Sequence, residues 1–207
     1  KTKNGLPLHR RAQRVGLRPS RNDEKGVSMR PVEIVKFWFD ELTQAQWWTK
    51  DEAVDAMITE RYSELHAQAV TGELYEWRGS ALGRLAEVII IDQFSRNMFR
   101  DSLRAFAYDV IALVLAQEAV QVGADQELSS QKRTFLYLPF MHSESALVHK
   151  RAVELFSQEG LEGNLDFENK HKVIIDRFGR YPHRNEVLGR ESTAEEIEFL
   201  KGPGSSF

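Results

Sequence analysis

The sequence predicts an all-α protein. Two observations carry this prediction: apolar residues recur every three or four positions after residue 29, and no alternating apolar–polar run exceeds four residues. We expect the helices to form antiparallel hairpins, arranged as a tetratricopeptide-like superhelix or as a compact helical array. A chain of 207 residues has the length of one domain, which we expect to span residues 29–207.

Residues 1–28 differ in charge from the rest of the chain. They carry eight basic and two acidic side chains, a charge of +6, whereas the remainder carries −9. A basic segment of this kind is typical of a nucleic-acid-binding arm or a transit peptide. It is also typical of a flexible or non-native extension ahead of a true start at Met29, which is the interpretation we favour. The acidic body argues against nucleic acid as a partner.

The amino-acid composition argues against several classes of protein. The chain has no cysteine, which excludes disulfides, thiol catalysis and cysteine-ligated zinc and is consistent with a reducing, cytoplasmic compartment. No apolar run approaches the roughly 20 residues that span a bilayer. The longest, Val88–Ile91, stops at Asp92. We therefore expect no membrane partner.

The first two helices are expected over residues 31–42 and 51–72. Pro31 suits a first helical turn, because backbone N–H groups in that turn have no acceptor within the helix and the absence of one costs nothing. The short connection between the helices carries Trp47 and Trp48. Adjacent side chains point in different directions, so we expect at least one of the two indoles to anchor this hairpin to the core.

The third helix, capped by Ser80, is the most apolar segment of the chain. It is apolar on nearly every side over Val88–Ile91, which predicts a position at the centre of the domain. Its continuation, residues 92–97, is polar at five of six positions. Asp92 and Arg96 are four residues apart, so they share a helix face and can pair. A buried helix that ends in this way either completes a polar network or lines a cavity.

Three helices are expected in the next part of the chain. The fourth is predicted to be capped by Asp101 or Ser102 and the fifth to start at Ser129 or Ser130. Pro139 falls inside the fifth helix, and a kink is expected because proline removes one backbone hydrogen bond. Ser143 is expected to cap the sixth.

The last two helices have clear end signals. The seventh is expected to start at Asn164 or Asp166 and to end at Gly179, a residue type that readily adopts the left-handed conformation after a helix. For the eighth helix, Ser192 and Glu195 have the spacing of a capping box.

Four sequence motifs, taken in order along the chain, resemble those of the bacterial domain-of-unknown-function family 924. The resemblance covers about residues 31–201 and leaves the basic segment outside. It implies a tetratricopeptide-like helical fold and leaves the activity open. The motifs are Asp92–Asn97, Phe135–Glu144, Arg177–Asn185 and Leu188–Arg190.

The motifs supply the candidate site. We expect their polar side chains to converge at the end of the third helix, because each motif lies at a helix end or kink. A histidine near a carboxylate is suited to acid–base chemistry, so the candidates for catalysis are His142, Glu144, His183 and Asp92. The candidate ligand-binding residues are Asp92, Gln93, Arg96, Asn97, His142, Glu144, Arg177, His183, Arg184 and Asn185.

These residues are compatible with three functions. Arginine-rich segments favour a binding module for an anionic small molecule or for a protein or peptide segment. A histidine–carboxylate pair favours an enzyme. A complete set of internal partners, such as Glu144 with Arg177 or Arg184, favours a scaffold held by buried ion pairs. No cofactor or metal is expected, because no His-x-x-x-His spacing occurs. The sequence does not decide the oligomeric state.

Overall fold

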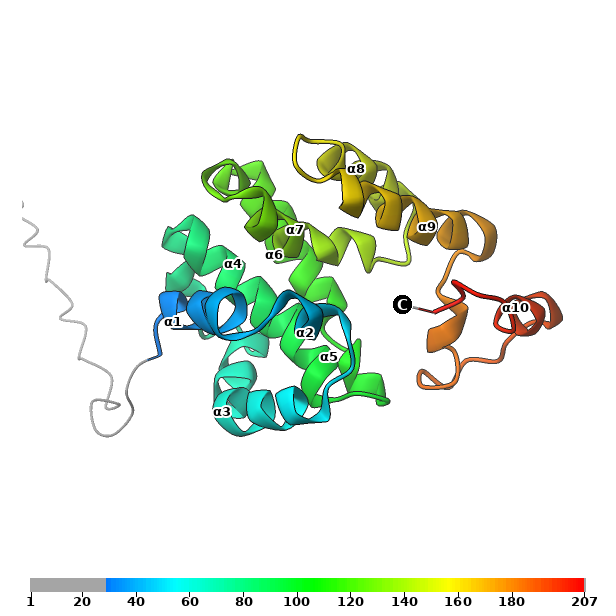
Figure 1. Ribbon diagram of the computed structural model, residues 1–207, viewed down its shortest axis with the longest axis horizontal. Helices are drawn as coiled ribbons and strands as arrows, with labels where there is room; N and C mark the ends of the chain where they lie inside the picture. The colour runs from blue at the N-terminus through cyan, green and yellow to red at the C-terminus, as the bar shows by residue number, and fades with distance from the viewer. Residues whose placement is uncertain (1–28, 207) are drawn as a thin grey trace, which may run out of the picture.

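The computed structural model describes residues 29–206, and this part of the chain is largely helical and has no strand (Figure 1). The prediction of an all-α fold is therefore confirmed. The expected non-native or flexible segment, residues 1–28, lies outside the described residues. The α-helices are α1 (Pro31–Lys36), α2 (Gln44–Trp48), α3 (Glu52–Val70), α4 (Ala81–Ile89), α5 (Ser95–Met98), α6 (Asp109–Gln121), α7 (Ser130–Met141), α8 (Ala146–Phe156), α9 (Glu162–Phe178) and α10 (Ala194–Phe199).

Short segments of other helical types complete the fold. Two are π-helical and continue α1 and α4 without a break, so each adds a wider turn to the helix before it. Four are 3₁₀ turns in the connections. The π segments are η1 (Phe37–Glu41) and η3 (Ile90–Phe94), and the 3₁₀ segments are η2 (Tyr75–Gly79), η4 (Leu103–Ala105), η5 (Ala124–Glu127) and η6 (Pro182–Arg184).

Helix α4, with its continuation η3, is the central element. It contacts α1, α6 and α7, and η3 also contacts α3. Val88–Ile91 are fully buried, as their all-round apolar character predicts. Ser80 caps α4 by accepting a hydrogen bond from the Gly83 amide at 3.1 Å. One large apolar core surrounds this helix.

The second half of the chain packs in order, α6 on α7, α7 on α8 and α8 on α9. Pro139 lies within α7, which runs on to Met141. Gly179 ends α9 in the left-handed conformation with φ 69°, as predicted.

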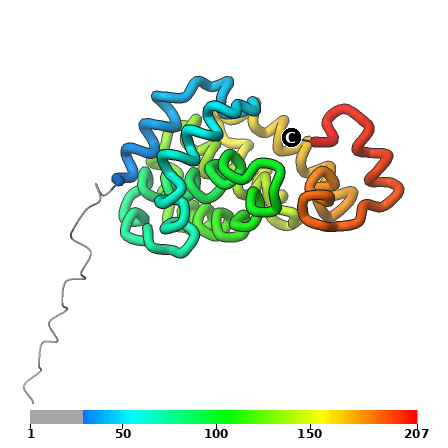
Figure 2. Tube along the Cα trace, turned by 90° about the horizontal axis from the view of Figure 1, so that it is seen from below, coloured from blue at the N-terminus to red at the C-terminus, as the bar shows by residue number. Residues whose placement is uncertain are grey.

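Residues 179–205, which we call the C-terminal arm, then form a separate lobe at one end of the molecule (Figures 1 and 2). A small apolar cluster joins the arm to the end of α9: Tyr181 packs with Ile174 and Ile175, and Phe178 and Phe199 pack against them.

Several predicted helix ends were wrong by a few residues. Helix α6 begins at Asp109, because Ser102 instead caps the 3₁₀ turn η4. Residue 145 rather than Ser143 precedes α8, and α9 begins at 162. The capping box of α10 uses Thr193 and Glu196, one position after the predicted pair. Neighbouring Ser, Thr and Glu residues offer the same local chemistry, so tertiary packing selects among them.

The Trp47–Trp48 connection is more ordered than expected, since it forms the short helix α2. Trp47 anchors it as predicted: its indole nitrogen donates to the Trp38 carbonyl at 2.8 Å. Trp48, in contrast, is 58% exposed.

Candidate functional site

Asp92 is the centre of the polar cluster at the end of α4. The π turn of η3 places its carboxylate in the core, where it is fully buried. One oxygen lies 2.8 Å from Nδ1 of His142 and 3.0 Å from Arg96, and the other accepts from Gln93 at 2.6 Å. Burial opposes ionisation, but these partners outweigh it and hold the pKa of Asp92 below its usual range. The first two motifs therefore meet, and the predicted Asp92–Arg96 pair is present.

Asp109 joins the third motif to this cluster, and it was not among the predicted site residues. It lies in the first turn of α6 and binds Arg96 through two parallel hydrogen bonds of 2.9 and 3.0 Å. The same carboxylate accepts from Arg184, on η6, at 3.2 Å. The only sequence signal is an acidic residue at a helix start, which is favourable at many helices and identifies no partner.

Arg184 is the least satisfied charge in the cluster. It is only 6% exposed, and its guanidinium lies over the rings of Phe106 and Tyr181, at 4.6 and 4.5 Å from their centroids. Its Nε is buried without a hydrogen-bond partner among the described residues. Burial, followed by repulsion from Arg96, lowers the pKa of Arg184. Two guanidinium groups thus share the carboxylate of Asp109.

Glu144 is paired with Arg190, not with Arg177 or Arg184 as one interpretation of the sequence expected. The two side chains form parallel hydrogen bonds of 2.6 and 2.9 Å. Glu144 also accepts from the Tyr181 amide at 2.8 Å, and Arg190 donates to Asn185 at 3.0 Å. Burial works against ionisation of Glu144, yet Arg190 and the amide lower its pKa overall. This pair fixes the start of the C-terminal arm to the turn before α8.

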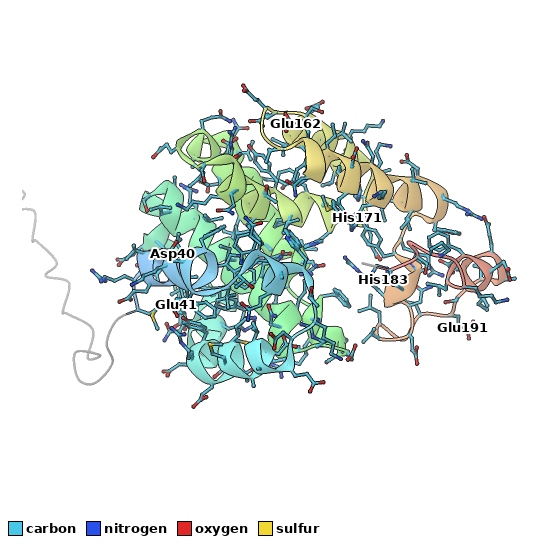
Figure 3. All side chains as sticks on the ribbon, in the orientation of Figure 1. Asp40, Glu41, Glu162, His171, His183 and Glu191 are labelled. Carbon is cyan, nitrogen blue, oxygen red and sulfur yellow. The ribbon has the colours of Figure 1, made fainter. Side chains whose placement is uncertain are left out.

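Three histidines border the Tyr181 ring. The ring centroids of His149, His171 and His183 lie 6.3, 5.8 and 5.6 Å from that of Tyr181, and Figure 3 shows His171 on α9 and His183 on the C-terminal arm at the junction of the two. Burial lowers the pKa of His171 to about 3 and that of His183 to about 4. Both side chains are therefore neutral at pH 7.

His183 and His142 keep hydrogen-bonding capacity in different ways. The Nδ1 of His183 is buried without a partner among the described residues. His142 directs Nδ1 at Asp92, and burial lowers its pKa, so a neutral ring donates Nδ1–H and leaves Nε2 as a lone-pair acceptor. An imidazole oriented by a buried carboxylate has the arrangement of a general base.

His149 and Glu168 form a buried pair next to the Tyr181 hydroxyl. His149 Nδ1 lies 2.7 Å from Glu168, and both side chains are fully buried. His149 Nε2 lies 2.8 Å from the Ser143 carbonyl, and the Tyr181 hydroxyl donates to the Met141 carbonyl at 2.5 Å. Burial raises the pKa of Glu168, although the hydrogen bond from His149 acts to lower it.

The structure brings eight of the ten candidate residues together and leaves two outside. Arg177 lies on the surface, 2.8 Å from Glu195. Asn97 donates to Asp55 of α3 at 2.7 Å. Asp55 also forms an ion pair with Arg100, so Asn97 belongs to a separate polar group. The members of the cluster are Asp92, Gln93, Arg96, His142, Glu144, His183, Arg184 and Asn185, to which the structure adds Asp109, Tyr181 and Arg190.

Two hollows are found elsewhere on the molecule. One of about 250 Å³ lies between α2 and the start of α7, and the other, of about 430 Å³, lies beside α2 and the start of α3. Neither is lined by a residue of the cluster. Within residues 29–206, no three His, Asp or Glu side chains are arranged to hold a metal ion. No helix in the same range has the length and apolar character needed to cross a bilayer.

Comparison with known proteins agrees with this architecture. A solved structure of a protein of unknown function, ATU0120 from Agrobacterium tumefaciens, superposes with a TM-score of 0.79 at 38% sequence identity, covering 83% of this chain and 97% of that chain. The comparison with curated proteins gives no match. The family model described as "Bacterial protein of unknown function (DUF924)" matches residues 34–204. This match covers most of the chain, and the chain therefore belongs to the DUF924 family.

Proposed function

We propose that the protein is a binding module for a small anionic molecule that carries a carboxylate or phosphate group. The observation that carries this proposal is Arg184, a buried guanidinium whose Nε lacks a partner among the described residues and which shares Asp109 with Arg96. Burial of a charge is costly unless its hydrogen bonds are complete. An anion beside Arg184 removes that cost, because it supplies both a charge and the missing acceptor.

The surroundings of Arg184 suit such a ligand. The rings of Phe106 and Tyr181 hold the guanidinium in one plane, and planar guanidinium groups bind carboxylates and phosphates through two parallel hydrogen bonds. A neutral His183 adds an unused ring nitrogen on the neighbouring residue. In contrast, Asp92 and Glu144 have complete sets of partners, so their role in this proposal is to position Arg96, His142 and the C-terminal arm.

A thermal-shift panel of inorganic phosphate, citrate, acetate and phosphorylated or carboxylated metabolite-sized compounds tests the proposal. A compound present at 100 times its Kd stabilises the folded state by about 2.7 kcal/mol, which raises the melting temperature by roughly 5–10 °C for a chain of this size. Arg184→Leu is expected to abolish this rise.

Arg177→Leu is the matched control, because Arg177 belongs to the same motif but is exposed. The control is expected to keep the full rise. If no anion stabilises the wild type at millimolar concentration, the small-ligand proposal is wrong and the cluster is better described as a scaffold of ion pairs. An equal loss in both variants also contradicts a site at Arg184.

The His142–Asp92 pair supports a second candidate function, an enzyme that uses His142 as a general base on the same ligand. The buried carboxylate fixes the ring, and the low pKa leaves Nε2 unprotonated at pH 7. To test this function, each compound that raises the melting temperature is incubated with the protein, and NMR is used to detect its conversion to a product. Conversion by the wild type and not by His142→Gln, with stabilisation kept in both, supports this function. Unchanged compounds in every case contradict it.

The proposal also includes the setting of the protein. We infer that the protein is bacterial and cytoplasmic, which is consistent with a chain that lacks cysteine. We also infer that its acidic body binds neither nucleic acid nor a membrane. The sequential packing of α6, α7, α8 and α9 supports a tetratricopeptide-like arrangement. A protein or peptide segment that ends in a carboxylate is a ligand of the same chemistry, so terminal carboxylates belong in the panel.

A further inference from the structure

The hollow between α2 and α7 has features of a second binding site. It has a volume of about 250 Å³ and is lined by side chains of α2, the first two turns of α7 and residues 160 and 164. Arg184, Asp109 and His142 are not among them, so this site is independent of the anion site proposed above. Gly160, with φ 81°, contributes no side chain to the space, and an added Cβ would lie 3.2 Å from Ser130.

A rigid aromatic surface lines the hollow. Trp48 is 58% exposed, yet its ring is stacked on Phe135 at a centroid distance of 5.4 Å and an interplanar angle of 15°. The neighbouring Trp47 is fixed by its bond to the Trp38 carbonyl and by edge contact with Phe135. The indole of Trp48 is thus held in place while more than half of it faces solvent, so a ligand that stacks on it costs little side-chain entropy.

The polar side chains that line this hollow are all uncharged. The lining contains no acidic or basic side chain, and its polar members are amides and hydroxyls. The amides of Gln44 and Gln131 make no hydrogen bond within residues 29–206, and Asn164 uses only its oxygen, which accepts from Thr134 at 3.2 Å. Several donors and acceptors are therefore available beside the indole.

We propose that this hollow binds an uncharged nucleobase or nucleoside. Purine and pyrimidine rings stack on exposed indoles. Their edges present paired donors and acceptors, which asparagine and glutamine amides match with two hydrogen bonds. The absence of a cation from the lining disfavours a phosphate group, so the ligand is the base or nucleoside rather than a nucleotide or a nucleic acid strand.

The dimensions favour a single ring system over a peptide. Proline-rich segments also bind to aromatic surfaces, but they are extended, at about 3.1 Å per residue, and need a long groove. The hollow is confined to α2, the start of α7 and the turn before α9, and its volume suits a small ligand.

Titration of the full chain with adenosine, guanosine, cytidine and uridine, followed by isothermal calorimetry and by saturation-transfer NMR, tests the proposal. At least one nucleoside is expected to bind, with saturation transfer to the protons of the base rather than to those of the ribose. Trp48→Ala is expected to weaken binding about 5- to 150-fold, the range for loss of one base–aromatic stack. Gln131→Ala should also weaken binding with the indole intact.

Tyr75→Ala is the matched control, because Tyr75 is 62% exposed and lies outside the hollow. It should leave the affinity unchanged, and melting curves establish that each variant is folded. Three results would overturn the proposal: no nucleoside binds at millimolar concentration, free ribose or a proline-rich peptide binds in place of the nucleosides, or Trp48→Ala and Tyr75→Ala behave alike.

Discussion

The body around α4 and the C-terminal arm are held together by different forces. In the body, α4 and η3 bury the unbroken run of aliphatic side chains Val88–Ile91. The ring of Phe94 contacts three further rings, those of Phe37, Trp38 and Tyr62. The arm, in contrast, shares only a small apolar cluster around Tyr181 with the end of α9.

The arm is also tied to the body by polar contacts. They include the pairs Glu144–Arg190 and Asp109–Arg184. Apolar burial is non-directional, whereas paired charges fix one geometry. The body therefore supplies most of the stability, and the polar cluster sets the position of the arm.

Phe94→Ala is expected to have the largest effect on stability. Removal of a buried ring costs about 3–5 kcal/mol, because the cavity is only partly refilled. Urea denaturation should show a lower midpoint with an unchanged slope, and hydrogen exchange should accelerate in α1, α3 and α4 as well as in the arm. Loss confined to the arm would contradict a single apolar core.

Asp109→Asn should have a smaller and more local effect. It leaves Arg96 and Arg184 without their shared charge, which we expect to cost about 2–4 kcal/mol, below the full value for a buried pair because the Asp109 side chain is 16% exposed. Hydrogen exchange should accelerate most in residues 179–205.

Glu195→Gln is the control, since this exposed partner of Arg177 should contribute less than about 1 kcal/mol. Equal effects of the two substitutions would show that the buried cluster does not position the arm.

The smallest expected effect is a change in pH dependence. Burial lowers the pKa of His183 to about 4 from an ordinary 6.5, so the unfolded chain takes up a proton first as the pH falls. The stabilisation by neutral His183 is complete above pH 6.5 and is lost between pH 6.5 and 4. We expect it to amount to about 1–3 kcal/mol.

His183→Asn should therefore flatten the plot of unfolding free energy against pH in this window. Asp92 and Glu144, whose pKa values are lowered, lose their contribution only at lower pH. The same slope in wild type and variant would show that the His183 ring is not buried in the folded protein.

Local patterns predicted the fold well because each depends on nearby residues. The all-round apolar segment identified the central helix, and Gly179 and Ser80 marked helix ends correctly. The site was predicted only in part. Asp109 is 75 positions from Arg184 in the sequence, and no local pattern relates them.

The same reason explains two wrong assignments. Several arginines were equally suited to pair with Glu144, and only the turn after η6 brings Arg190 to it. Arg177, seven residues before Arg184, points instead to the surface and to α10. Periodicity thus predicts which face a residue occupies, whereas the partner of a charge depends on how distant elements pack.

The number of residues in the wide turn at Ile90–Phe94 determines which side chains after it can form ion pairs and hydrogen bonds with other helices. A π turn contains one residue more than an α turn, and each helical residue rotates the next by about 100°. Loss of one residue here would leave the apolar segment before it in register but would swing Arg96 and Asn97 away from Asp109 and Asp55. The register of this segment is thereby coupled to two other helices, and an insertion or deletion in it needs matching changes in α3 and α6.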